Sequence, residues 1–169
     1  MRKLLRLMFA VALVALTTVV VNAAPPATAT ATVTVNAAVS ATAKLALGAT
    51  SIHFIDADPD VTSSIQQTEP AITVSAKAKT STGGNVTLTV VSGSDLTSGT
   101  DTIAISNVTW TVSGSGFAAG TMSSSTAQSL GSWTNSGTWS GTQTYALANS
   151  WAYHTGAYTA TLTYTLTAP

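Results

Sequence analysis

A stretch of alternating apolar and polar residues, which we call the ribbon, covers residues 27–47. Every odd position in it is apolar, and most even positions are Thr, Ser, Asn or Lys. Strict alternation predicts a β-strand that buries one face. At about 3.3 Å per residue the ribbon would extend roughly 70 Å, whereas a usual strand has about 5–6 residues. Either the ribbon bends between two sheets of its own domain, or part of it leaves the domain and another surface covers its apolar face.

Shorter alternating stretches follow the ribbon, separated by connections rich in Gly, Ser and Thr. They cover residues 51–55, 71–79, 85–91, 142–147 and 157–166. We expect 71–91 to form a hairpin through the turn residues 80–84, and the last stretch to lie at the centre of one sheet. Between residues 103 and 112 the apolar positions change from odd to even numbers. This change predicts a bulge or a switch of sheet near Asn107.

The chain after residue 23 shows no convincing helical periodicity, so the pattern predicts an all-β protein. Alternating stretches at this spacing, each with one apolar face, are typical of antiparallel sheets packed on one face. We therefore expect a single immunoglobulin-like antiparallel β-sandwich of about seven or eight strands.

The first 23 residues have the pattern of a secretory signal peptide. Basic residues at positions 2, 3 and 6 precede an almost unbroken apolar run at 7–21, and Val21-Asn22-Ala23 places apolar or small residues at the −3 and −1 positions of a cleavage site. The sequence thus predicts a signal peptide at 1–23 and one β-sandwich domain at 24–169. We expect the mature protein to be secreted or held at the cell surface, without a membrane span.

The predicted mature chain carries few charges. Three lysines stand against six acidic residues, a net charge of −3. The lysines are Lys44, Lys77 and Lys79, and the acidic residues are Asp56, Asp58, Asp60, Glu69, Asp95 and Asp101. This balance excludes a basic nucleic-acid-binding surface. Cysteine is absent, so no disulfide holds the domain. Low charge and high β-propensity also describe chains that associate through their strands.

Residues suited to enzymatic chemistry are sparse. Nucleophilic catalysis needs a base beside the nucleophile, and His53 and His154 are the two histidines. No serine is framed as a nucleophile elbow, so we predict no enzymatic activity and no cofactor. Asp56, Asp58 and Asp60 have the spacing that begins a calcium loop, but Val61 and Gln67 stand where an EF-hand needs Gly and Glu. The three aspartates are candidate ligands of a looser calcium site or form a solvated acidic loop.

The four tryptophans fall into two groups. Trp110 alternates with Val108 and Val112, which predicts a place in the core. The others, Trp133, Trp139 and Trp151, lie in connections rich in Gly, Ser and Thr. Aromatic residues in such connections either close the end of a sandwich or form an exposed platform for sugar rings.

The whole pattern resembles the cysteine-free major pilins of the alternate chaperone–usher class, the colonisation-factor fimbriae. The matching segments are the alternating residues 31–39, residues 105–110 ending in Trp110, and the closing stretch 155–166. A second resemblance is to WxL domains, which attach to bacterial cell walls. It rests on Trp110-Thr-Val112 and on the ending 164–169, with Val112 in place of Leu and Tyr164 in place of Trp.

Two functions follow from these resemblances. The first is a structural surface protein, a pilin-like subunit of a fimbrium that serves cell adhesion and joins copies of itself or related subunits by β-strand donation through residues 29–39. Its strand-donation face would be Ala29, Ala31, Val33, Val35, Ala37 and Val39, with Leu45 and Leu47 in the subunit's own body. The alternative is a carbohydrate- or cell-wall-binding module that uses Trp133, Trp139 and Trp151. It is also open whether the ribbon is donated or folds back as a bent first strand shared by both sheets.

Overall fold

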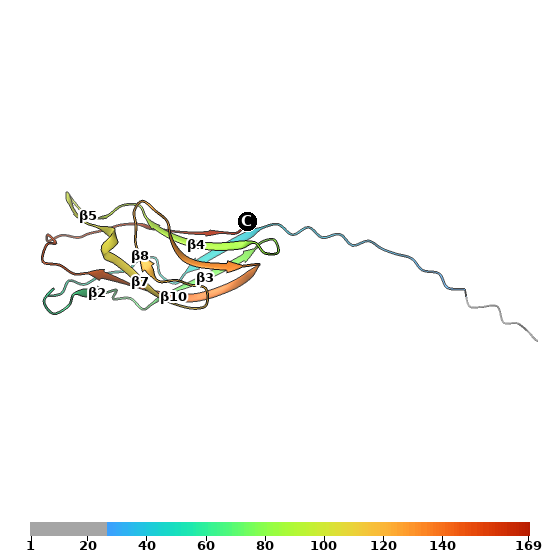
Figure 1. Ribbon diagram of the computed structural model, residues 1–169, viewed down its shortest axis with the longest axis horizontal. Coiled ribbons are helices and arrows are strands. Elements are labelled where there is room, and N and C mark those ends of the chain that lie inside the picture. Colours follow the sequence, from blue (N-terminus) through green and yellow to red (C-terminus); the bar gives the residue numbers. More distant parts are fainter. Residues whose placement is uncertain (1–26) are drawn as a thin grey trace, which may run out of the picture. The chain divides into compact units, whose positions relative to one another are not determined.

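The computed structural model of the protein describes residues 27–169, so the predicted signal peptide lies outside the described residues. Contacts divide the chain into two units, 1–37 and 38–169. The second unit is a sandwich of antiparallel sheets (Figure 1), which confirms the predicted all-β fold class. Residues 27–169 include no helix with the length and apolarity needed to cross a membrane.

Two sheets form the layers of the sandwich. The first sheet has the order β1-β3-β10-β7-β8, with β2 paired to the far part of β10, and the second has the order β11-β4-β9. The strands of the first sheet are β1 (Thr42–Leu47), β2 (Ser64–Gln66), β3 (Ile72–Lys79), β7 (Val108–Ser113), β8 (Gly120–Thr121) and β10 (Gly137–Ala148). Those of the second are β4 (Asn85–Ser92), β9 (Gln128–Thr134) and β11 (Leu162–Thr167). A separate pair is formed by β5 (Leu96–Ser98) and β6 (Asp101–Ile103).

Seven of these strands have six residues or more, which agrees with the predicted seven or eight. Their alternation sets the core. In β3 and β4 every second side chain is buried, and Val74, Val86 and Leu88 are completely buried. Trp110 and Tyr145 pack edge to face at 6.3 Å between ring centroids, and the indole of Trp110 donates to the carbonyl of Ala118 at 2.9 Å. Trp110 therefore occupies the core position predicted from its spacing.

The expected hairpin over 71–91 is wrong. Although β3 and β4 are joined by only the residues 80–84, they belong to opposite sheets and do not pair with each other. The connection between β9 and β10 crosses between the sheets in the same way, and the two crossings are linked because Asn135 Oδ1 accepts a hydrogen bond from the Gly83 amide at 2.6 Å. Alternation determines which face of a strand is buried, but it does not determine which strand lies alongside.

The shift of the apolar residues from odd to even positions near Asn107 marks a switch of sheet, which is one of its two predicted causes. A single 3₁₀ turn, η1 (Ile105–Asn107), separates β6 from β7, and these two strands belong to different sheets. The last strand differs from expectation, because β11 lies at the edge of its sheet and not at its centre. It begins at Leu162, since Thr159 forms only an isolated bridge to Thr97.

The packing predicts a large loss of stability from Leu88→Ala. Leu88 is fully buried in β4 between β11 and β9, so truncation should lower the free energy of unfolding by about 2–5 kcal/mol. Urea unfolding followed by tryptophan fluorescence measures this loss. Thr165→Ala on the exposed face of β11 is the control and should change stability by about 0.5 kcal/mol or less. Equal losses in the two variants would contradict the assigned core.

Candidate functional site

The two lateral sides of the sandwich are built differently. On one side, residues 114–127, which connect β7 to β9 and include β8, form hydrogen bonds with both sheets. The Ala118 amide donates to the Leu130 carbonyl of β9 at 2.9 Å, and the Ser132 amide donates to the Gly116 carbonyl at 3.0 Å. The same segment then pairs with β7 as β8. Backbone hydrogen bonds therefore close this side from sheet to sheet.

The opposite side, where β1 and β11 are the edge strands, is open. These two strands lie against each other, yet in the described part of the chain no strand pairs with the outer edge of either. The inward side chains of β11, at Leu162, Tyr164 and Leu166, are only half-buried. On the neighbouring β4 the inward residues are completely buried. The open side thus combines unpaired backbone groups with an incompletely covered apolar face, which is the chemical description of a site for an added strand.

Tyrosine side chains hold the exposed edge strand in place. Tyr164 of β11 donates a hydrogen bond to Gln143 Oε1 at 2.9 Å and accepts one from the Tyr145 hydroxyl at 2.6 Å. Gln143 is fully buried, and its Nε2 has no hydrogen-bond partner in the described chain. Burial raises the pKa of both phenols, so Tyr145 and Tyr164 are neutral hydrogen-bonding groups. This network ties β11 across the core to the longest strand of the other sheet.

The ribbon forms a strand only in its last part. β1 takes residues Thr42–Leu47, whereas residues 27–41 form no strand and the side chains of 27–44 are all exposed. Val33 is 89% exposed and Val35 87%. Among the described residues, therefore, the bent first strand shared by both sheets is not formed. The six residues of the predicted strand-donation face, Ala29, Ala31, Val33, Val35, Ala37 and Val39, are exposed.

The three tryptophans predicted as a glycan platform do not all lie in connections as the sequence suggested, because Trp133 belongs to β9 and Trp139 to β10. Trp133 is 8% exposed and stacks on Trp139 with 4.7 Å between ring centroids and 14° between planes. Its indole donates to the Ser115 carbonyl at 2.9 Å. Trp139 is half-buried, and of the three only Trp151 is exposed, at 70%. Trp133 and Trp139 therefore close the sandwich between its sheets, and Trp151 is the one indole with a free face.

The acidic loop makes local hydrogen bonds. Asp58 Oδ1 accepts from the Asp60 amide at 2.9 Å, and Asp60 Oδ1 accepts from the indole of Trp151 at 3.0 Å. Within residues 27–169, no three His, Cys, Asp or Glu side chains come together as metal ligands would. The carboxylates of Asp56, Asp58 and Asp60 consequently have no common centre.

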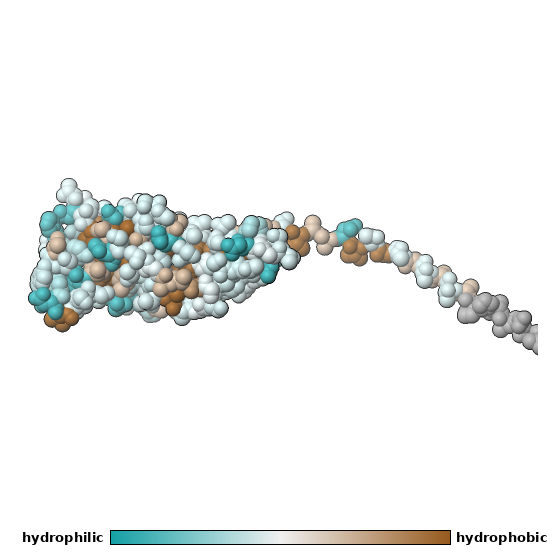
Figure 2. All heavy atoms as spheres, in the orientation of Figure 1, coloured by the Kyte–Doolittle hydropathy of each residue, from teal (hydrophilic) through white to brown (hydrophobic). Residues whose placement is uncertain are grey.

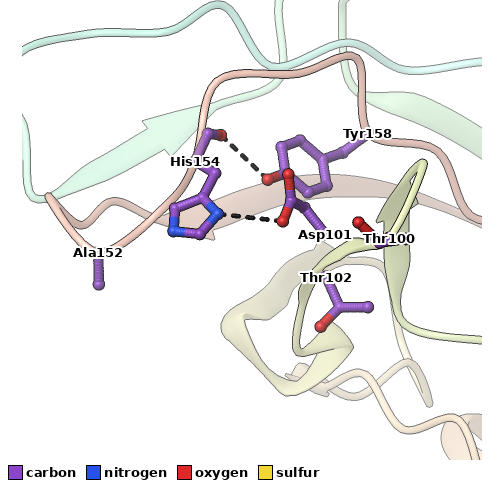
Figure 3. A pocket seen from close by; sticks show the side chains of 6 residues that line it. All are labelled: Thr100, Asp101, Thr102, Ala152, His154 and Tyr158. Carbon is purple, nitrogen blue, oxygen red and sulfur yellow. Dashed lines mark hydrogen bonds and ion pairs between the residues drawn. The ribbon is translucent and has the colours of Figure 1, made fainter.

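Each histidine pairs with a carboxylate that the sequence analysis did not connect with it. His154 Nδ1 lies 3.0 Å from Asp101 Oδ1 beside a hollow of about 230 Å³, and Tyr158 donates to the His154 carbonyl (Figure 3). His53 pairs with Glu69, and hydrogen bonds from the His53 side chain and backbone lower the pKa of Glu69 to about 2. In the described residues no Ser or Thr hydroxyl is hydrogen-bonded to either imidazole. Neither pair therefore has the nucleophile–base arrangement of a hydrolase.

Comparison with known proteins does not identify the chain. No family model matches it, and neither a curated protein nor a solved structure matches it.

The tyrosine network predicts a specific effect of Tyr164→Phe. Loss of the hydroxyl leaves the Gln143 amide and the Tyr145 hydroxyl without this partner, so the free energy of unfolding should fall by about 1–3 kcal/mol. The midpoint of urea unfolding measures the change, which should occur at an unaltered m-value. Tyr158→Phe is the matched control, because its hydroxyl donates at an exposed site. A Tyr164→Phe protein as stable as this control would show that the network does not hold β11.

Proposed function

We propose that this protein is an exported structural surface protein, a pilin-like subunit that joins copies of itself by β-strand donation through residues 29–39. One observation carries the proposal. Among the described residues, no strand pairs with the outer edge of β11, and the same chain has an exposed alternating segment of strand-like sequence. In this proposal the exposed segment is the donor and the edge of β11 is the acceptor.

The donated segment supplies what the open side lacks. Its backbone pairs with the free edge of β11 and satisfies those N–H and C=O groups. Its alternate side chains cover the half-buried Leu162, Tyr164 and Leu166. These side chains are Ala29, Ala31, Val33, Val35, Ala37 and Val39. Because they are small, at about 25 cal/mol per Å² they stabilise a joint by several kcal/mol at most before the entropic cost of association.

The direction of donation follows from the strand register. We call one end of the sandwich the base. It contains Lys79, residues 80–84, residues 135–136 and Pro169. β1 begins at the base, with Thr42 opposite Lys79, and β11 ends there, with Thr167 opposite Thr87. In a row of copies with one orientation, residues 29–39 of one copy continue from its base and enter the next copy at the opposite end. The donated strand then runs antiparallel to β11.

Several properties of the chain support this function. The predicted signal peptide directs the protein out of the cell, and the low charge and absence of cysteine suit a body held together by strands. The resemblance to the cysteine-free pilins of the alternate chaperone–usher class covers the ribbon and the closing strand. We therefore propose that the protein acts at the cell surface, as a structural component of a fimbrium.

Deletion of residues 24–38 tests the proposal. The truncated protein should still fold, because β1 begins at Thr42. It should sediment as a monomer at all concentrations, whereas the mature protein should form concentration-dependent oligomers or fibres. A peptide of residues 27–41 added to the truncated protein should bind it. If the truncated protein unfolds and the mature protein is a monomer at every concentration, strand donation is wrong.

A charge on the donated face provides a sharper test. Val33→Asp leaves the fold intact, since Val33 is 89% exposed, but it would bury a carboxylate in the joint. Assembly measured by light scattering should therefore weaken at least about tenfold. Thr34→Asp adds the same charge on the opposite face of the segment and should leave assembly nearly unchanged. Equal effects of the two substitutions would count against a donated strand with one buried face.

A second candidate function is binding of a glycan or wall polymer, and the exposed indole of Trp151 is the observation in its favour. The residues that carry the WxL resemblance give this function less support, because Trp110 is buried and the Tyr164 hydroxyl is hydrogen-bonded inside the core. Binding of polysaccharide that survives Trp151→Ala, or tryptophan fluorescence that polysaccharide does not change, would exclude this mode of recognition.

A further inference from the structure

The few charges of the sandwich are separated along its length. We call the end opposite the base the tip, made of residues 55–63, 95–103 and 149–158. Five of the six acidic residues lie there: Asp56, Asp58, Asp60, Asp95 and Asp101. The loops of the tip are fastened together, because Asn149 Nδ2 donates to the carbonyls of Ala57 and Thr62 at 2.8 and 3.0 Å, and Asp101 pairs with His154. Side-chain contacts therefore connect the three segments of this acidic tip.

All three lysines lie in the half of the sandwich next to the base. Lys44 of β1 stands directly opposite Lys77 of β3, and Lys79 ends β3. All three are exposed, and in residues 27–169 no lysine lies within 4.0 Å of a carboxylate. Like charges directly opposite each other on neighbouring strands are destabilising. Among the residues that the structure describes, the lysines thus have no carboxylate partner, and an anionic surface from outside would relieve their repulsion.

The two ends also differ in shape and polarity. At the tip, the apolar side chains of Ile55, Val61 and Trp151 are 68%, 82% and 70% exposed. At the base, a hollow of about 660 Å³ is lined by Val39, Ala41, Lys79 and Pro169, among others. Figure 2 shows hydrophilic side chains at both ends of the sandwich, with an apolar group projecting beside those of the tip. One end thus projects apolar side chains among carboxylates, and the other has a hollow beside a lysine.

We propose that the acidic tip of one copy docks on the basic base of the next copy, with Trp151 and Val61 against the hollow beside Lys79. Opposite charges orient the two molecules and speed their encounter. Because the two surfaces are different, the contact is heterologous and repeats without closing, which produces a filament. For its place in the filament the contact rests on the proposed function, because strand donation requires the same head-to-tail order. Apart from Val39, which lines the hollow, the docking contact uses other residues.

Charge reversal on the mature protein tests this contact. One variant carries Lys77→Glu and Lys79→Glu at the base, a second carries Asp56→Lys and Asp60→Lys at the tip, and a third combines all four. The initial rate of assembly is followed by light scattering at low and high salt. Each single-end reversal should slow assembly about tenfold at low salt, and the combined variant should regain most of the rate because the charges are complementary again. High salt should slow the original protein towards the rate of the single-end variants.

Matched controls separate this effect from a change of net charge or of folding. Thr111→Glu and Thr111→Lys add charges of either sign on the exposed face of β7, which belongs to neither end, and should leave the rate within about twofold. Circular dichroism and urea unfolding of every variant verify that the sandwich is intact. Recovery of the rate in the combined variant cannot arise from misfolding, because that variant carries every substitution of the other two.

The outcomes distinguish the two proposals. If the reversals and salt leave the rate unchanged while deletion of 24–38 abolishes assembly, docking of tip on base is wrong and strand donation stands. If the deletion leaves association intact and the reversals abolish it, docking stands and strand donation is wrong. A combined variant as slow as either single-end variant overturns the pairing of tip with base. A mature protein that never associates overturns both.

Discussion

The unpaired edge of β11 is the constraint on which the rest of the structure depends. Backbone N–H and C=O groups need partners, and an edge strand presents a full row of them. In this sandwich the β8–β9 side is closed by backbone hydrogen bonds through the segment 116–121, whereas the β1–β11 side is not. Leu162, Tyr164 and Leu166 are consequently left half-covered. An added strand of alternating small apolar residues would satisfy the backbone and cover these side chains together.

A strand with an unpaired outer edge needs contacts with the rest of the domain to keep its position. β11 pairs with β4 along its whole length, and Tyr164 reaches across the core to Gln143 and Tyr145. Buried hydrogen-bond networks are costly to disrupt, because each lost partner leaves a polar group unsatisfied. The network therefore makes β11 a firm template while its outer edge remains available. A site for strand addition needs such a strand, which is fixed on its inner side and free to form backbone hydrogen bonds on its outer side.

Because the sandwich carries few charges, the position of each one has a large effect on the charge distribution of the whole domain. With three lysines in one half of the sandwich and five aspartates at the opposite end, the body has a polar axis parallel to its strands. Thr, Ser, Asn and Gly supply most of the remaining hydrophilic surface, so few competing ionic contacts are available. This polar axis and the proposed donation of residues 29–39 would favour the same head-to-tail order of copies.

The sequence by itself determined the elements and their buried faces. Alternation at 71–79 and 85–91, the spacing of Trp110 and the change of parity near Asn107 each correspond to a strand, a core residue and a switch of sheet. These features are local, because the side-chain period of a strand follows from its backbone geometry. The all-β class and six of the seven long strands follow from the same pattern. In contrast, β9 lies where the sequence suggested a connection, and the alternating residues 51–55 form only an isolated bridge at Phe54.

Only the tertiary structure decided which strands are neighbours and which side remains open. The short connection 80–84 looked like a hairpin turn, yet it crosses between the sheets, as the connection 135–136 does, and the apolar stretch at the end became an edge strand. The exposure of Trp151, the burial of Trp133 and the pairing of His154 with Asp101 likewise depend on loops that meet in space. Of the candidate site, the ribbon was visible in the sequence, and the acceptor edge was not. Pairing of strands is a long-range choice among chemically similar partners, and nothing in the alternation of a single strand distinguishes them.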